Sequence, residues 1–273
     1  MNHNVKNYPI AKLIADFDGT VTQKDTISSL VLTAAEHRND QDDFLERWEQ
    51  LVQWYVSQQE SNVGKWLSAP MPEKHLIDFL KSFNPIEQES LLRVTRHKFL
   101  FGLTKHDLQQ LGRNVLKRKG VANVLKELQA STVEIEILSA NWSRTLIQSA
   151  MGELCDQVWT NSLVFDDFNK STGEIRQNVT SAQDKLSFFE RYRSKVGKTL
   201  YIGDSITDFL AILSADIGVL IGNNHVARQV IDFFEIPTVS VTKKQKYNPE
   251  IHQSGIILLV DSWSDLEDFL RSK

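Results

Sequence analysis

Two carboxylate side chains, Asp16 and Asp18, follow directly on an apolar run at residues 13–15 and stand before a Gly-Thr pair. In a β-strand, residues i and i+2 point to the same side, so both carboxylates are predicted to face one site where the chain leaves a sheet. Two such charges about 4 Å apart repel by roughly 4 kcal/mol at an effective dielectric constant near 20. A hard divalent cation with oxygen ligands, such as Mg²⁺, would allow both to stay ionised. The alternative is a strand that ends in a solvated acidic turn.

Two further predicted strands also end in polar side chains. The apolar run at residues 133–138 is followed by Ser139, and the run at residues 199–202 is followed by Asp204 and Asp208. In open α/β sheets, ligands bind beyond the carboxyl ends of the strands. We therefore expect the three strand ends to contribute to one site.

The chain alternates β-type and helical patterns, which predicts an α/β fold with a parallel sheet covered by helices on both faces. Apolar runs predict strands at residues 13–17, 133–138, 199–202, 217–221 and 256–260. The spacing of apolar residues predicts helices at residues 143–151, 184–193 and 208–215. Turn-forming residues predict a hairpin or loop at residues 166–173.

The segment at residues 28–119 differs from the rest of the chain. It lacks β-type runs, and its aromatic and leucine residues recur at largely helical spacing. We expect an inserted helical domain at residues 28–119, and a core domain formed by residues 1–27 and 120–273. The aromatic side chains of the insert are expected to pack inside it rather than to contact a ligand.

Composition limits the partners and the location of the protein. The 273 residues carry a net charge of −4, which gives no reason to expect nucleic acid binding. No apolar stretch approaches the roughly 18 residues needed to span a bilayer, and the first residues lack the hydrophobic segment of a signal peptide. The single cysteine, Cys155, excludes an internal disulfide and fits a reducing compartment. We expect a cytoplasmic protein without nucleic acid or membrane partners; its oligomeric state is not readable from the sequence.

Four motifs in this chain resemble those of the haloacid-dehalogenase-like superfamily of phosphohydrolases. They are DFDGT at residues 16–20, the strand that ends in Ser139, a lysine, and GDSxxD at residues 203–208. The resemblance covers residues from about 12 to about 222. It implies a Rossmann-like core and, because the helical segment lies between the first two motifs, an α-helical cap domain as in the branch that includes phosphoserine phosphatase. It also implies a Mg²⁺-dependent phosphatase.

The resemblance gives the first two carboxylates catalytic roles. Asp16 would attack phosphorus in line and form an aspartyl-phosphate, which splits one difficult displacement into two easier ones. Asp18 would be the general acid towards the leaving alkoxide and then the base that activates water. Family members that break carbon–halogen bonds lack this second aspartate, so its presence favours phosphoryl transfer.

The resemblance also implies the metal ligands. The carboxylates of Asp16 and Asp204, with the backbone carbonyl of Asp18, would hold Mg²⁺. Asp208 would orient these ligands or the lysine without contacting the substrate. The alternative for Asp208 is an acidic residue at a helix N-terminus that only complements the helix dipole.

A serine and a lysine would bind the phosphate group. The resemblance implies a hydrogen bond from Ser139 to a phosphate oxygen, helped by the backbone N–H groups of Ala140 and Asn141 where a helix begins. The alternative for Ser139 is a helix N-cap. Lys185 would stabilise charge on the transferred phosphoryl group. We prefer it to Lys198, which precedes a predicted strand and so would lie at the wrong end of the sheet.

Asp25, Asn141 and Trp142 are predicted to contact the rest of the substrate. Phosphoserine phosphatases carry a glutamate at the position of Asp25 that meets the ammonium group of the substrate, so Asp25 favours a positively charged substrate; capping of the first cap helix is the alternative. The ring of Trp142 either stacks on a flat or cationic group or packs against the cap. Three cap arginines are candidates, by position alone, for binding a substrate carboxylate: Arg47, Arg93 and Arg96.

The residues around Trp142 and Asp204 further resemble the phosphatase domains that plants fuse to a TenA-type domain, which act on thiamin monophosphate, and related stand-alone fungal and plant proteins. We expect a phosphomonoesterase for a small metabolite, with thiamin monophosphate as the first candidate. Phosphoserine, phosphoethanolamine, phosphocholine and pyridoxal phosphate are alternative substrates. A catalytically idle phosphate-binding or regulatory protein is the alternative outside the enzyme class, and the sequence does not separate hydrolysis from transfer to an alcohol.

Overall fold

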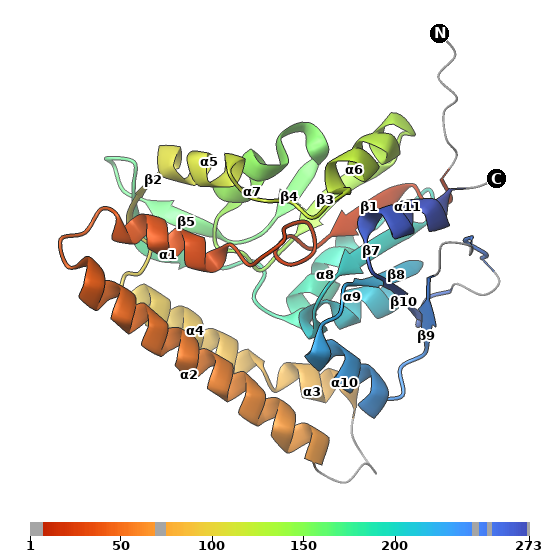
Figure 1. The fold of residues 1–273 in the computed structure, drawn as a ribbon, viewed down its shortest axis with the longest axis horizontal. Helices are drawn as coiled ribbons and strands as arrows, with labels where there is room; N and C mark the ends of the chain where they lie inside the picture. Colours follow the sequence, from red (N-terminus) through yellow and green to blue (C-terminus); the bar gives the residue numbers. More distant parts are fainter. Residues whose placement is uncertain (1–7, 69–74, 242–245, 250–252, 272–273) are drawn as a thin grey trace.

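The computed structural model describes residues 8–68, 75–241, 246–249 and 253–271, and its centre is a seven-stranded parallel sheet (Figure 1). The strand order is β4-β3-β1-β7-β8-β10-β9, and neighbouring strands run parallel throughout. The strands are β1 (Lys12–Ala15), β3 (Glu134–Leu138), β4 (Gln157–Trp159), β7 (Thr199–Gly203), β8 (Ile217–Ile221), β9 (Thr238–Ser240) and β10 (Ile257–Val260). The α/β class and the five strands predicted from apolar runs are confirmed.

Two apolar cores lie on the two faces of this sheet. In β1, Leu13 and Ala15 pack into one core and Ile14 into the other, because successive strand residues point to opposite faces. Strands buried on both faces need continuous apolar runs, which is the pattern that revealed them in the sequence. The first core is covered by α6 (Val121–Ala130), α7 (Arg144–Met151) and α11 (Trp263–Leu270), and the second by α8 (Ala182–Tyr192), α9 (Phe209–Ser214) and α10 (His225–Phe233).

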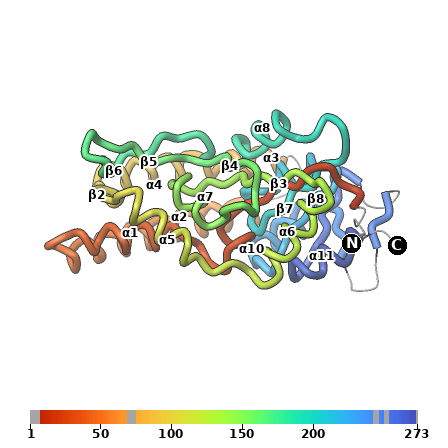
Figure 2. The backbone as a smooth tube through the Cα atoms, turned by 90° about the horizontal axis from the view of Figure 1, so that it is seen from above, coloured from red at the N-terminus to blue at the C-terminus, as the bar shows by residue number. Residues whose placement is uncertain are grey.

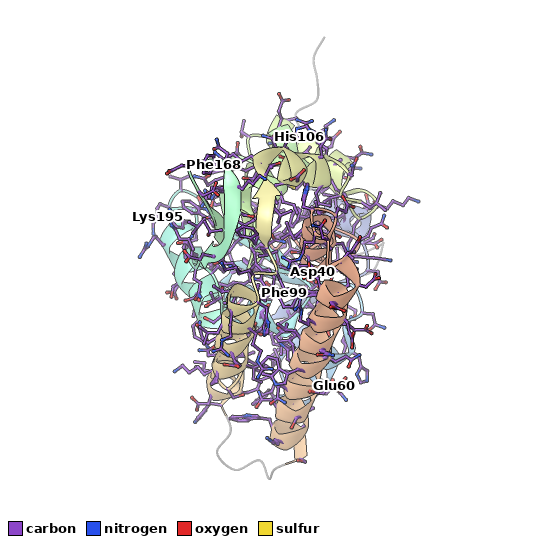
Figure 3. The ribbon with its side chains drawn as sticks, turned by 90° about the vertical axis from the view of Figure 1, so that its left-hand side faces the viewer. Asp40, Glu60, Phe99, His106, Phe168 and Lys195 are labelled. Carbon is purple, nitrogen blue, oxygen red and sulfur yellow. The ribbon has the colours of Figure 1, made fainter. Side chains whose placement is uncertain are left out.

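Four helices of the predicted cap extend beyond one end of the sheet (Figure 1). They are α1 (Ile27–Ala35), α2 (Gln41–Ser68), α3 (Leu76–Lys81) and α4 (Asn84–Arg96). Figure 2 shows α1, α2 and α4 at the end of the molecule opposite the two termini. Figure 3 views this end directly, with α2 and α4 side by side, Glu60 far along α2 and Phe99 near the join to the small sheet. Within the described ranges, no helix is both long and apolar enough to cross a membrane.

The expectation that residues 28–119 are purely helical is wrong in one element. β2 (Phe101–Thr104) lies in this segment and pairs antiparallel with β6 (Lys170–Arg176), which in turn pairs with β5 (Ser162–Phe165). A four-residue strand between two helices leaves too short a pattern to be recognised. Its last residue, Thr104, also caps the following helix through the backbone N–H of Asp107 at 3.2 Å.

The hairpin predicted at residues 166–173 is present, because β5 and β6 are joined there. Gly173, however, belongs to β6 rather than to the turn. The helix α5 (Lys105–Arg113) packs on α7 of the core. The packing is close, since a Cβ on Gly112 would lie 2.3 Å from the carbonyl oxygen of Leu146. The domain boundaries near residues 27 and 120 stay a prediction.

Candidate active site

The carboxyl ends of three neighbouring strands, β3, β1 and β7, meet at one edge of the sheet. Asp16 follows β1, and its backbone N–H donates to the carbonyl oxygen of Ile202 in β7 at 2.9 Å. Ser139 follows β3 and Asp204 follows β7. The topology therefore brings together the three polar strand ends that the sequence pattern had singled out.

A buried lysine connects two of the carboxylates. Nζ of Lys185, on α8, lies 3.0 Å from Oδ1 of Asp16 and donates to Oδ1 of Asp208 at 2.7 Å. The hydroxyl of Tyr201 donates to the same Asp208 oxygen at 2.8 Å, while the backbone N–H and the hydroxyl of Ser205 donate to Oδ2. Burial alone would lower the pKa of Lys185, but the charges of Asp16 and Asp208 raise it overall. Lys185 therefore stays cationic.

Asp16, Asp204 and Asp208 can each bring one carboxylate oxygen within 4.8 Å of the others. Burial raises the pKa of Asp16 well above its usual range, although Lys185 opposes this effect. Burial, with the charge of Asp208, likewise raises the pKa of Asp204 to about 6. Added positive charge would favour the ionised form of both carboxyls, and a set of carboxylate oxygens suits Mg²⁺. The residues present therefore fit the predicted metal, and the fully hydrogen-bonded Asp208 fits an orienting role.

The Gly-Thr pair of the first motif brings the β1 loop against Asp204. Gly19 has a φ of +73°, and a Cβ there would lie 2.5 Å from Oδ2 of Asp204. The hydroxyl of Thr20 donates to Oδ1 of Asp204 at 3.0 Å. Behind the loop, Arg118 donates to the carbonyl of Gly19 at 2.6 Å and the indole of Trp263 to that of Thr20 at 2.9 Å. Only glycine permits both this conformation and this close approach.

Asp18 is held by three hydrogen bonds. Thr26 donates to Oδ1 from its backbone N–H at 2.8 Å and from its hydroxyl at 2.7 Å, and Nδ2 of Asn141 donates to Oδ2 at 2.7 Å. Burial and the charge of Asp25 raise the pKa of Asp18 to about 6, while these hydrogen bonds lower it. A carboxyl whose pKa lies close to neutrality can both give and accept a proton, as a general acid and base must.

The side chain of Asn141 is engaged inside the protein. Besides its bond to Asp18, Nδ2 donates to the hydroxyl of Thr26 at 2.9 Å, and Oδ1 accepts from the backbone N–H of Ser143 at 2.9 Å. Both amide hydrogens are thus used, and the residue is 2% exposed. This geometry supports a role in positioning Asp18; the substrate contact predicted for Asn141 stays a prediction.

The turn after β3 differs from the expectation. The helix α7 begins at Arg144, with Ser143 as its N-cap, so Ala140 and Asn141 precede the helix rather than open it. The backbone N–H of Asn141 donates to the hydroxyl oxygen of Ser139 at 3.1 Å. This N–H thus has an internal partner in the structure, and its contact with phosphate stays a prediction. Ser139 is not the N-cap, since Ser143 takes that position.

A cavity of about 440 Å³ joins these core residues to the predicted cap. Asp25 lines it, and its Oδ1 also accepts from the backbone N–H of Ile27, the first residue of α1, at 2.9 Å, although the N-cap residue itself is Thr26. Trp142 lines the cavity too and packs edge-on against Trp48 of α2, with ring centroids 6.5 Å apart. Both alternatives for Trp142 and both for Asp25 are therefore compatible with the structure.

The cap arginines lie elsewhere. Arg47 and Arg93 form ion pairs with acidic neighbours, Arg93 also covers the ring of Trp54, and Arg96 is exposed. None of the three is among the described residues that line the cavity. Lys198, the rival to Lys185, donates to the hydroxyl of Tyr247 at 2.6 Å and is not part of the described lining either.

The sequence interpretation missed the cap side of the cavity. The residues that α2 and α4 contribute recur at helical spacing: Trp48, Leu51, Val52, Tyr55 and Val56 on α2, and Glu87, Ser90 and Leu91 on α4. Such positions share one face of a helix. Trp48 packs in the core, as expected for the aromatic residues of the insert, and it also lines the cavity. The sequence carried only a weak signal for Glu87, its helical spacing from Ser90 and Leu91, because this spacing does not show what the shared face meets.

Solved structures with the same fold include phosphoserine phosphatases. A substrate-bound phosphoserine phosphatase superposes with a TM-score of 0.56 at 16% sequence identity, over 82% of this chain and 91% of that one. This likeness shows the fold. The motif residues gathered at the site are the ones by which the sequence resembles the haloacid-dehalogenase-like phosphatases, so the fold and the site agree with that class.

In sequence, the chain is similar to two curated proteins in particular. The bifunctional TH2 protein, mitochondrial, of Arabidopsis thaliana is 27% identical over 300 residues, which are 94% of this chain and 48% of that protein. A CTO1 family protein of Schizosaccharomyces pombe is 26% identical over 247 residues, 81% of this chain and 85% of that protein. The chain thus spans about half the length of the plant relative. No family model matches the chain.

Proposed function

We propose that this protein is a Mg²⁺-dependent phosphomonoesterase that hydrolyses a small phosphorylated metabolite through an aspartyl-phosphate. The observation that carries the proposal is the meeting of a nucleophile, a proton donor, a hydroxyl and a cation at one cavity: Asp16, Asp18, Ser139 and Lys185. Each of these residues has a position suited to its proposed role.

The phosphate group of the substrate would lie between Ser139 and Lys185. Asp16 attacks phosphorus as the alkoxide leaves, and Asp18 donates the proton that makes this leaving group an alcohol. Asp18, now ionised, then takes a proton from water as the water oxygen attacks the aspartyl-phosphate, which releases phosphate and regenerates Asp16. Lys185 balances negative charge on the transferred group. Mg²⁺, held by Asp16, Asp204 and the Asp18 carbonyl, would supply charge that keeps Asp16 ionised.

Thiamin monophosphate is the substrate that we propose first. Its support is the resemblance of the sequence to plant phosphatase domains that act on this compound, and a cavity of about 440 Å³ with Trp48 and Trp142 in its wall. Cavities that hold drug-sized ligands measure about 300–1,000 Å³. Among the described lining residues, Lys185 is the single cation and is already paired with two carboxylates. A substrate carboxylate would lack a partner there, which argues against phosphoserine.

The test is phosphate release from thiamin monophosphate, phosphoethanolamine, phosphocholine, pyridoxal phosphate and phosphoserine, with Mg²⁺ and with EDTA. We expect metal-dependent turnover that the Asp16→Asn variant loses while it stays folded. Retained activity in that variant would overturn the mechanism. Release from none of the esters by a folded protein that binds Mg²⁺ would favour the idle phosphate-binding alternative, and product formation that requires an added alcohol would favour phosphotransfer. A cytoplasmic location is likewise a proposal, and fractionation of the cells would test it.

A further inference from the structure

Three cap residues, Tyr55, Gln59 and Glu87, form a hydrogen-bonded group at the wall of the cavity. The hydroxyl of Tyr55, on α2, donates to Oε1 of Glu87, on α4, at 2.8 Å. Nε2 of Gln59 donates to the same Glu87 oxygen at 2.9 Å and to the Tyr55 hydroxyl at 2.5 Å. Tyr55 and Glu87 line the cavity that also contains Asp16. The mechanism proposed above uses none of these three side chains.

The charge of Glu87 is not balanced by a cation within the described part of the chain. Its hydrogen-bond donors there, Tyr55 and Gln59, are neutral, and both bonds go to Oε1, so Oε2 takes no hydrogen bond from the described residues. Burial raises the pKa of Glu87, whereas these two hydrogen bonds lower it. The pKa of Tyr55 is raised by burial and by the charge of Glu87, so Tyr55 stays a neutral donor. A half-buried carboxylate of this kind gains most from a cationic ligand.

Other residues that line the cavity also favour a cationic ligand. Asp25 adds a second carboxylate to the cavity. The rings of Trp48 and Trp142 meet at an interplanar angle of 83°, so they present two walls, and Tyr55 adds a third aromatic ring to the lining. Aromatic faces attract cations electrostatically, and cages of such rings recognise quaternary ammonium groups. Carboxylates and aromatic rings together therefore form an environment for a positively charged, preferably flat, organic group.

We propose that Glu87, held in place by Tyr55 and Gln59, determines specificity by recognising a positive charge on the alcohol part of the substrate. This inference rests on the proposed phosphatase function, and it adds the class of ester: monoesters of cationic alcohols. Phosphate binds at the strand ends, and the cationic group binds against α2 and α4. The competing interpretation is that Glu87 only ties α2 to α4, in which case its charge is irrelevant to the choice of substrate.

The experiment compares Glu87→Gln with a matched control, Glu89→Gln. Glutamine keeps the shape of glutamate and still accepts hydrogen bonds from Tyr55 and Gln59, so the variant retains the link between the helices. Glu89 lies on the same helix, pairs with Arg93 at the surface with a side chain that is 40% exposed, and is not part of the cavity lining described. The substrates are thiamin monophosphate, phosphocholine, and the neutral isostere of phosphocholine in which carbon replaces the ammonium nitrogen.

We expect the wild type to prefer phosphocholine over its neutral isostere in kcat/KM. Glu87→Gln should reduce this preference by tenfold or more, and it should raise KM for thiamin monophosphate by a similar factor. The activity of this variant on the neutral ester should change by less than about twofold. Glu89→Gln should leave all values unchanged. An equal loss on charged and neutral esters, or no change in preference, would show that Glu87 is structural and would overturn the inference.

A binding measurement separates this inference from the proposed function. Thiamin, which carries no phosphate, is titrated calorimetrically into the wild type and both variants. If the wild type hydrolyses none of the esters, the proposed function fails. Thiamin binding that is weakened tenfold by Glu87→Gln and not by Glu89→Gln would then still support a cation site in the cap. No binding, or equal binding by both variants, would overturn it.

Discussion

Replacing Gly203 by alanine tests how tightly the site depends on the position of Asp208. Gly203 ends β7, and a Cβ there would lie 2.2 Å from Cγ and 2.5 Å from Oδ2 of Asp208. Ordinary contacts begin at 3.4 Å, so Asp208 would have to move by about 1 Å. It has no room to do so, because it is 0% exposed and is bonded to Lys185 at 2.7 Å and to Tyr201 at 2.8 Å.

The size of the effect follows from this geometry. Overpacking of a filled interior costs about 1–3 kcal/mol. In a protein of this size, each kcal/mol lowers the melting temperature by roughly 2–4 °C. Because Lys185 bridges Asp208 and Asp16, a shift of Asp208 also displaces the lysine from the nucleophile, and a misplacement of about 1 Å can reduce kcat by roughly 100-fold. We therefore expect Gly203→Ala to be both less stable and nearly inactive.

Scanning calorimetry and phosphate release check both parts. The control is Gly64→Ala on α2, where a Cβ would meet no atom within 4 Å. Since alanine favours a helix over glycine, this control should be about 0.5–1 kcal/mol more stable and fully active. A Gly203→Ala protein that melts at the wild-type temperature with full activity would refute the argument that Asp208 is confined.

Three other perturbations test the charges and contacts of the site. In the metal-free protein, burial raises the pKa of Asp204 from 3.8 to about 6. The folded chain therefore binds this proton more tightly than the unfolded chain does. The free energy of unfolding then falls as the pH rises from about 4 to about 6. Mg²⁺ should therefore raise the melting temperature more at about pH 7.5 than at about pH 5; an equal gain at both would contradict this. Lys185→Met should cost about 3–5 kcal/mol in urea unfolding, because it leaves Asp16 and Asp208 buried without their cation, and an unchanged midpoint would argue against the ion pairs. Asn141→Ala should lower kcat by roughly 10–100-fold with KM unchanged, because Asp18 loses a positioning bond; a raised KM with normal kcat would instead indicate direct substrate contact.

The fold was predictable because its signals are local. A strand of the central sheet is covered on both faces, so almost every residue in it must be apolar, and runs such as residues 217–221 stand out in the sequence. The polar residues that follow β1, β3 and β7 could be assigned to one site because parallel neighbouring strands end at the same edge. Lys185 could be preferred to Lys198 for the same reason. Lys198 directly precedes β7 and therefore lies at the amino end of this strand, away from the site.

Long-range contacts decided the remaining features of the site. The partners Asn141 and Asp18 are 123 residues apart, and Tyr55 and Glu87 are 32 residues apart, so no local pattern pairs them. In the sequence, Glu87 is an ordinary acidic residue in the first turn of a helix, a place favoured by the helix dipole. The packing of α4 against α2 turns the same side chain towards the cavity. Residue types and their spacing thus determined the sheet and the chemistry at its edge, because burial and strand direction impose them locally. Tertiary packing alone determined which cap side chains face the substrate cavity, because that depends on how separate helices meet.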